Sequence, residues 1–182
     1  MPESSKTKTL EIYKAESFPK KWRKHSVLIN DALYADSIFI DDRNILTYDN
    51  FSRPRRAVFL RFAKDVWTEV YYHNDPEVLL RPAGKAFMFQ GKLIVPLQDS
   101  SNGEYGHGIH FSTINNDFAN GSPFVYLKTI KPKDLIVKRV LPSKICGLHT
   151  YNIEREIEVI DIKRRGFNLF SFFGLIIKKL FK

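Results

Sequence analysis

Three polar residues stand at equivalent places in the sequence, each just before an apolar run. They are Asp36, Arg81 and His149. A carboxylate accepts hydrogen bonds from hydroxyl groups, and a guanidinium group binds an anion through a fork of donors. If the Asp, Arg and His side chains converge at one site, they could therefore bind a sugar or a sugar phosphate. In the alternative interpretation the three are ordinary turn residues that precede strands.

Two loops in the middle of the chain are rich in amide, carboxylate and hydroxyl groups, which suit a hydroxyl-rich ligand. The predicted substrate-binding residues are therefore Asp36, Arg81, Gln98, Asp99, Tyr105, His107 and His149. Two carboxylates that flank a glycosidic bond can act as acid and base in its hydrolysis. The catalytic candidates are Asp36 and Asp99, and Glu104 is a further partner for Asp99. Against this, Asp99 lies in a Ser- and Gly-containing stretch where Asp is common in turns.

The strand pattern that must position these residues repeats along the chain. Between residues 57 and 62 the side chains alternate with a period of two, which is typical of a half-buried strand. A first unit comprises predicted strands at residues 37–40, 45–48, 57–62 and 66–71. A second unit comprises predicted strands at residues 85–89, 93–97, 107–114 and 124–129, and a third unit begins at 151–153 and 157–160.

Repeated units of four strands are the pattern of propeller blades. The sequence therefore predicts an all-β, partial β-propeller of about two full blades and the start of a third, and a β-sandwich is the alternative. The predicted boundaries are a low-order leader at residues 1–16, the propeller at 17–165 and a basic amphipathic helix at 166–182. Open strand edges would remain, and such edges tend to pair. A second chain that completes the propeller is one expectation, and a truncated propeller is the other.

The composition is that of a soluble globular protein, with 43% hydrophobic and 27% charged residues and a formal net charge of +9. The positive charge concentrates at the two ends rather than between aromatic residues on strands, so no nucleic-acid role is expected. Cys146 is the single cysteine, which excludes an intrachain disulfide. His107 and His110 are three apart on a predicted strand and would face opposite ways, so we expect neither a metal site nor a cofactor. The two tryptophans are expected in the core or between blades.

The last sixteen residues, FNLFSFFGLIIKKLFK, differ in character from the rest of the chain. They are too few to span a bilayer comfortably, which takes about 20 residues. A basic, aromatic-rich helix is suited to the headgroup region of a membrane. The predicted membrane-binding residues are Phe170, Phe172, Phe173, Ile176, Lys178 and Lys179. The alternative is a helix that docks on the rim of the propeller.

Four strings of residues together resemble the propeller domain named after plant glucosamine inositolphosphorylceramide transferase. They are Arg81-Pro82-Ala83-Gly84, Phe89-Gln90-Gly91-Lys92-Leu93, Pro96-Leu97-Gln98-Asp99 and Tyr105-Gly106-His107-Gly108-Ile109. The run from Gly147 to Arg164 looks like the closing segment of that domain, so the resemblance covers about residues 25–165. It implies a five-bladed propeller related to family 43 glycosidases and a role in envelope glycan or glycolipid assembly. It transfers no catalytic residues, and the chain is shorter than five blades require.

The leading prediction is a propeller module of surface glycan or glycolipid biosynthesis that works beside a glycosyltransferase. It would bind a sugar nucleotide or a lipid-linked sugar, in the cytoplasm and peripherally on the inner face of the membrane. One alternative is an enzyme of the glycoside hydrolase family 43 type. The other is a non-catalytic scaffold or truncated remnant. Whether the chain is itself an enzyme is left open by its sequence.

Overall fold

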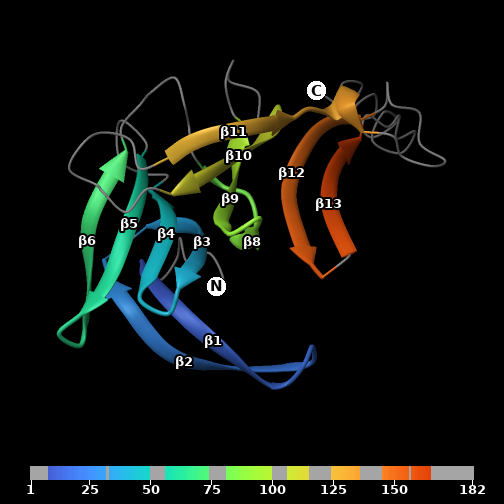
Figure 1. Ribbon diagram of the computed structural model, residues 1–182. Coiled ribbons are helices and arrows are strands. Elements are labelled where there is room, and N and C mark those ends of the chain that lie inside the picture. The colour runs from blue at the N-terminus through green and yellow to red at the C-terminus, as the bar shows by residue number, and fades with distance from the viewer. Residues whose placement is uncertain are drawn as a thin grey trace, which may run out of the picture.

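The computed structural model describes residues 8–31, 33–49, 56–73, 81–99, 106–114, 124–135, 145–155 and 157–164. These residues form an all-β structure of four antiparallel sheets, which follow one another in chain order (Figure 1). The first sheet pairs β1 (Thr9–Ser17) with β2 (Lys21–Asn30). The second has the order β3 (Tyr34–Asp41), β4 (Asn44–Asp49), β5 (Arg56–Ala63) and β6 (Val66–His73).

The centre of the third sheet is β9. One edge of β9 pairs with β10, and the other pairs with two short strands, β7 and β8, instead of one long strand. Its strands are β7 (Arg81–Pro82), β8 (Phe87–Phe89), β9 (Lys92–Asp99), β10 (Gly108–Ile114) and β11 (Phe124–Ile130). A single 3-10 turn, Pro132–Asp134, follows β11 within the described residues. The fourth sheet pairs β12 (Ile145–Glu154) with β13 (Ile157–Arg164).

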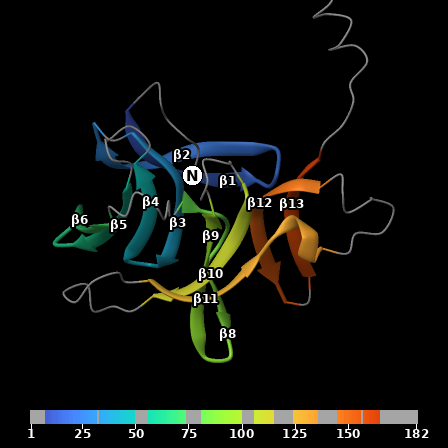
Figure 2. The same cartoon turned by 90° about the horizontal axis from the view of Figure 1, so that it is seen from above.

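Each sheet packs on the next through its own hydrophobic cluster. Leu10 of β1 meets Val58 and Leu60 of the second sheet. The second and third sheets meet through a cluster that includes Leu46, Phe59, Val95 and Leu97. The third and fourth sheets meet through Ile109, Leu148, Tyr151 and their neighbours. The clusters therefore join the sheets in the order of the chain. Viewed from above, the second, third and fourth sheets follow one another across the molecule, and the β1–β2 hairpin lies along one side (Figure 2).

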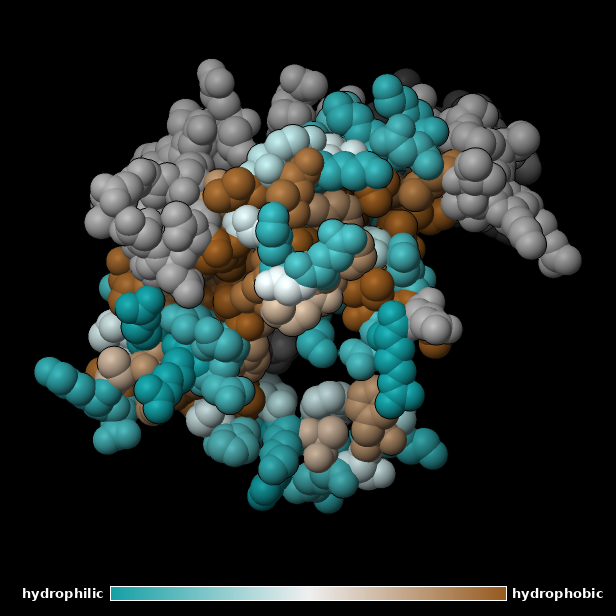
Figure 3. Space-filling view, viewed as in Figure 1, coloured by the Kyte–Doolittle hydropathy of each residue, from teal (hydrophilic) through white to brown (hydrophobic). Residues whose placement is uncertain are grey.

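This succession of sheets explains why the inner part of each central sheet is apolar on both faces. On β4, Ile45 packs toward the first sheet and the next residue, Leu46, packs toward the third. Both side chains are fully buried. Burial of one such side chain contributes about 1.5–3 kcal/mol to stability. Apolar side chains accordingly gather where the second, third and fourth sheets meet, whereas hydrophilic ones cover much of the β1–β2 hairpin (Figure 3).

Main-chain contacts fasten the third sheet to the fourth. The amide of Tyr151 donates to the carbonyl of Ala83 at 2.7 Å, and the amide of Leu148 donates to the carbonyl of Gly106 at 2.8 Å. Gly84 allows this approach because a Cβ atom at that position would lie 1.8 Å from the carbonyl oxygen of Tyr151. Real side chains do not tolerate such a distance, so the backbones of the two sheets can meet here only at a glycine.

The all-β class predicted from the sequence is confirmed, and each of the ten predicted strands overlaps a strand of the structure. The described residues form four sheets rather than the two of the sandwich alternative. The predicted leader at residues 1–16 overlaps β1 from Thr9 onward, so the part from that residue is a paired strand and not a segment of low order. The predicted C-terminal helix at residues 166–182 lies outside the described residues.

Within the described ranges, the structure contains no helix with the length and hydropathy that a membrane span requires.

Candidate functional site

A β-bulge in β3 sets the position of Asp36. The register between β3 and β4 shifts between Ala35 and Ile38, and Asp36 has a left-handed backbone with φ of +49°. Asp tolerates this conformation better than most residues, and a bulge re-aims a side chain out of the regular alternation. The hydroxyl of Thr47 supports the bulge, since it donates to the carbonyl of Ala35 at 3.2 Å and lies 2.6 Å from the hydroxyl of Ser37.

The re-aimed carboxylate of Asp36 forms an ion pair with Arg81. Asp36 belongs to the second sheet and Arg81 to β7 of the third, so this pair links two sheets. The side chains are 24% and 19% exposed. The guanidinium carbon also lies 5.8 Å from the centre of the Tyr48 ring, within the range of a cation–π interaction. Two of the three polar residues that the sequence singled out are therefore in direct contact.

Gln98 lies beside Arg81, because the two are register partners on β9 and β7. Its side chain is buried, with 1% exposed. The Nε2 atom donates to the carbonyl oxygen of His149 at 3.1 Å, which fixes the orientation of the amide. The Oε1 atom is buried and has no hydrogen-bond partner among the described residues. A buried amide oxygen without a donor is uncommon, so a donor supplied by a ligand or solvent is expected there.

His149 stands in a second bulge, at the corresponding strand of the fourth sheet. The register between β12 and β13 shifts between Leu148 and Thr150, on either side of His149. The backbone carbonyl of His149 faces Gln98, whereas its imidazole Nδ1 lies 3.1 Å from the carboxylate of Asp161 on β13. The structure thus links Asp36, Arg81, Gln98 and the backbone of His149 across three sheets, but the imidazole turns toward its own sheet.

Asp99 belongs to a different cluster, on the opposite face of the third sheet from Gln98. The carboxylate of Asp99 is 4% exposed and lies 3.5 Å from Nε2 of His110. The other imidazole nitrogen, Nδ1, lies 2.5 Å from the hydroxyl of Thr129, which in turn lies 3.1 Å from that of Tyr126. Burial lowers the pKa of His110, although the nearby Asp99 carboxylate acts in the other direction. Adjacent residues on a strand face opposite ways, so Gln98 and Asp99 cannot serve one small pocket together.

The remaining predicted residues fall outside these two clusters. Nε2 of His107 lies 3.5 Å from the Lys131 ammonium group. Tyr105 and Glu104 lie outside the described residues, as do the predicted membrane-binding residues Phe170, Phe172, Phe173, Ile176, Lys178 and Lys179. The described residues contain no cluster of three or more His, Cys, Asp or Glu side chains that could hold a metal ion.

Sequence reasoning missed three residues that complete these clusters. Tyr48 and Thr47 lie in a sequence run that has the pattern of an ordinary buried strand. Only the structure shows that Thr47 supports the bulge at Asp36 and that the Tyr48 ring lies against Arg81. The sequence raises His110 only in connection with a metal site. The two neighbouring predicted strands at 93–97 and 107–114 are a signal that would place it near Asp99, because Asp99 pairs with Gly108 and His110 follows Gly108 by two residues.

Comparison with known proteins gives the chain a family. The family described as the N-terminal region of glucosamine inositolphosphorylceramide transferase 1 matches residues 1–124. A relative from Oryza sativa subsp. japonica, named glucosamine inositolphosphorylceramide transferase 1, is 30% identical over 128 residues. The protein of the same name from Oryza sativa subsp. indica is 31% identical over 121 residues.

Each alignment covers 60% of this chain and 16% of the relative, so the chain corresponds to a small part of these proteins. No solved structure matches the chain. The matched residues include Asp36, Arg81, Gln98 and Asp99 but not His149. Because the match extends over more than half of the sequence, this chain belongs to the family of the N-terminal region of glucosamine inositolphosphorylceramide transferase 1.

Proposed function

We propose that this chain is a propeller module that binds a sugar nucleotide or a lipid-linked sugar during glycolipid synthesis. In this proposal each sheet is a blade, and β3, β7 and β12 are the innermost strands around a common axis. The face-to-face succession of the four sheets supports the blade arrangement. The contacts from Asp36 through Arg81 and Gln98 to the His149 backbone support a shared site at the inner strands.

The buried Oε1 atom of Gln98 is the observation that carries the proposal. The amide cannot be reversed without placing this oxygen against the carbonyl of His149, so the unpaired acceptor is fixed in place. A hydroxyl group of a ligand would supply the missing donor. The neighbouring carboxylate of Asp36 accepts further hydroxyl hydrogen bonds, and the guanidinium of Arg81 suits a phosphate. A hydroxylated ring that carries a phosphate group combines these features.

The names of the relatives agree with this ligand class. They refer to glucosamine and to inositolphosphorylceramide, and both words name hydroxylated rings. We extend only the ligand class to this chain, because the aligned part is 16% of each relative. In the proposal the chain holds the sugar or the lipid headgroup for a transferase. Catalysis by Asp99 with Glu104 stays a prediction, since only Asp99 is among the described residues.

Isothermal titration with myo-inositol 1-phosphate and with UDP-N-acetylglucosamine tests the proposal. We expect saturable binding of at least one probe and a loss of tenfold or more in affinity for Gln98→Leu. Leu has a similar volume and removes only the polar end, so the fold should persist. Thr68→Val, which likewise removes a polar group at similar volume from an exposed residue of β6, is a control outside the linked set and should bind as the wild type does. Failure of both probes to bind the folded wild-type protein would contradict the proposal.

A peripheral place on the cytoplasmic face of the membrane is part of the same proposal. The sequence of residues 167–182 combines apolar and aromatic side chains with Lys178 and Lys179. Such a composition favours the surface of anionic bilayers. Co-sedimentation with phosphatidylserine-containing liposomes should fall when residues 167–182 are deleted. Unchanged co-sedimentation of the deleted protein would rule this part out and leave the sugar-binding proposal standing.

A scaffold role is a second candidate, which the edges of the outer sheets favour. Within the described residues, β13 pairs with β12 alone, and its Ile157 and Val159 are 69% and 57% exposed. Exposed strand edges of this kind pair with other chains. We therefore propose that a second chain can extend the propeller at β13. Sedimentation velocity should show concentration-dependent association that Val159→Lys weakens, and a concentration-independent monomer would contradict it.

A further inference from the structure

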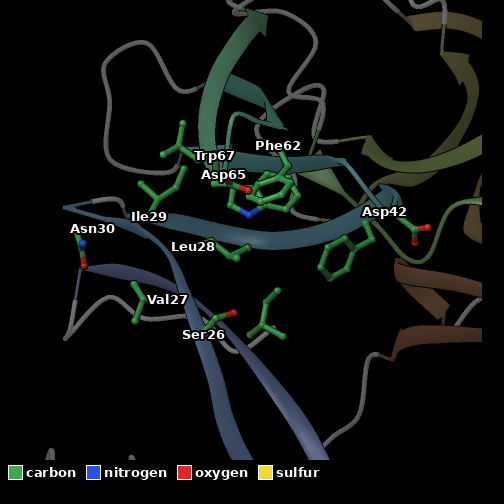
Figure 4. A pocket seen from close by; sticks show the side chains of 12 residues that line it. Ser26, Val27, Leu28, Ile29, Asn30, Asp42, Phe62, Asp65 and Trp67 are labelled. Carbon is green, nitrogen blue, oxygen red and sulfur yellow. The ribbon is translucent and has the colours of Figure 1, made fainter.

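A groove lies between the first and second sheets, separate from the linked residues of the candidate site. Its volume is about 650 Å³, which is in the range of small-molecule sites. One wall comes from β1 and β2, and the other from the ends of β3, β5 and β6 together with the turns that join β3 to β4 and β5 to β6. Val27, Leu28 and Ile29 of β2 line this space, and Leu28 and Ile29 lie nearer than Val27 to the rings of Phe62 and Trp67 (Figure 4). The groove is therefore an apolar slot with turns at its rim.

Three aromatic rings form the wall on the side of the second sheet. The Trp67 ring lies 5.4 Å from that of Phe62 and 6.5 Å from that of Phe39, measured between ring centres. Trp67 also packs on the hydrophobic cluster between the sheets, which holds the group in place. Phe39 and Phe62 remain 41% and 36% exposed, so ring surface is accessible from the groove. Aromatic faces carry negative electrostatic potential and attract cations.

Among the described residues, the charged side chains that line the groove are Asp42 and Asp65, both acidic. No Lys or Arg of the described ranges lines it, in a chain whose net charge is +9. Neither carboxylate has a hydrogen-bond or ion-pair partner among the described residues. The adjacent Asp41, in contrast, accepts hydrogen bonds from the Arg43 amide and the Asn44 side chain within its turn. Asp65 lies beside Phe62 and Trp67, where it can reach the same ligand (Figure 4).

We propose that this groove binds an amphipathic ammonium ligand, which is an organic ammonium group on an apolar chain. The apolar walls would take the chain, while the aromatic rings and the unpaired carboxylate of Asp65 would hold the cation, and Asp42 adds negative charge at the other end of the groove (Figure 4). An anionic ligand of the same shape is disfavoured because it would approach these carboxylates with no compensating cation among the described lining residues. This site involves none of Asp36, Arg81, Gln98 and His149, so it goes beyond the function proposed above and does not depend on it.

Three probes of equal chain length and different charge test the charge preference. They are octylammonium, octanol and octanoate, the two ions used below their micelle concentrations and octanol below its solubility limit. Trp67 fluorescence reports occupancy in a Trp22→Phe background, because the chain contains two tryptophans. We expect saturable octylammonium binding, at least tenfold tighter than octanol, with octanoate the weakest. Equal affinities for octylammonium and octanol, tighter octanoate binding or no saturable response would overturn the proposal.

Charge-neutralising variants separate the carboxylates from the walls. Asp65→Asn keeps the size of the side chain, and Asn tolerates the left-handed backbone at this position, where φ is +61°. It should weaken octylammonium binding about fivefold and leave octanol binding unchanged. Glu154→Gln, on the fourth sheet, removes the same charge far along the chain and should have no effect on either probe. Equal losses in the two variants would show a response to net charge and contradict a built site.

Discussion

Asp36 and Arg81 form an ion pair that joins the second sheet to the third, although 45 positions separate them in the sequence. Asp36 reaches its partner because the β3 bulge turns it out of the regular alternation. The Tyr48 ring then lies against the guanidinium group. Both halves of the pair stand at the start of a strand unit, so one contact fixes the first strand of each sheet relative to the other.

This pair is expected to couple the stabilities of the two sheets. In a double-mutant cycle of Asp36→Asn and Arg81→Met, the coupling energy should be about 1–3 kcal/mol, since the side chains are largely buried and in contact. The Lys85–Glu154 pair, with side chains 72% and 76% exposed, is the control and should give about 0.5 kcal/mol or less. Urea denaturation measures both cycles. Equal couplings would show that the pair between the sheets is no stronger than a surface pair.

Gly84 should tolerate no side chain, because a Cβ atom there would lie 1.8 Å from the carbonyl oxygen of Tyr151. Gly84→Ala is expected to destabilise the protein by about 3 kcal/mol or more, since the third and fourth sheets must separate. Gly91→Ala is the matched control. Gly91 also has a positive φ, of +74°, but nothing lies within 4 Å of its Cβ position, so only a backbone cost of about 1–2 kcal/mol applies. Similar thermal stabilities of the two variants would refute the close approach.

His110 should make the free energy of unfolding depend on pH. Burial lowers its pKa in the folded state from an ordinary value of 6.5, so the unfolded chain binds the proton more readily. Above the ordinary pKa of about 6.5, His110 is neutral in both the folded and the unfolded state, and its full contribution to stability is present. As the pH falls below about 6.5 toward the lower pKa of the folded state, the unfolded state takes up the proton first, and the free energy of unfolding decreases. His110→Asn cannot titrate and should show a smaller loss between about pH 7.5 and pH 5. Denaturation curves of both proteins with the same pH dependence would exclude this role.

Most strands follow from their local pattern, and the exceptions have physical reasons. In β5, Val58 and Leu60 point toward the first sheet, and the alternation of the sequence made this strand predictable. The β1–β2 sheet does not follow fully from the local pattern, because β2 is largely exposed and carries little apolar periodicity. Trp67 packs between sheets as predicted, but Trp22 is 50% exposed, and so its predicted burial is wrong.

The sequence predicts only the part of the site whose residues occupy equivalent positions in the repeated strand units. The positions of Asp36 and Arg81 at two unit starts pointed to their meeting, and they are in contact. The bulge at His149 could not be seen in the sequence, and it turns the imidazole toward Asp161. Gln98 and Asp99 were grouped because they are adjacent, but alternation along β9 sends them to opposite faces. The positions of β-bulges, and the side of a sheet to which each side chain points, depend on the pairing of strands, and local sequence patterns do not encode them.

The proposed site makes two side-chain signals the most direct reporters of a ligand, because Gln98 and Arg81 are register partners on adjacent strands. In a nuclear magnetic resonance titration with whichever of myo-inositol 1-phosphate and UDP-N-acetylglucosamine binds, the Gln98 side-chain amide and the Arg81 Nε–H signals would be followed together. If one ligand occupies the inner strands, both signals shift with the same midpoint, and Gln98→Leu moves the midpoint of the Arg81 shift to a ligand concentration at least tenfold higher. If the two signals stay fixed or follow different midpoints at saturating ligand, these residues do not form a common binding site.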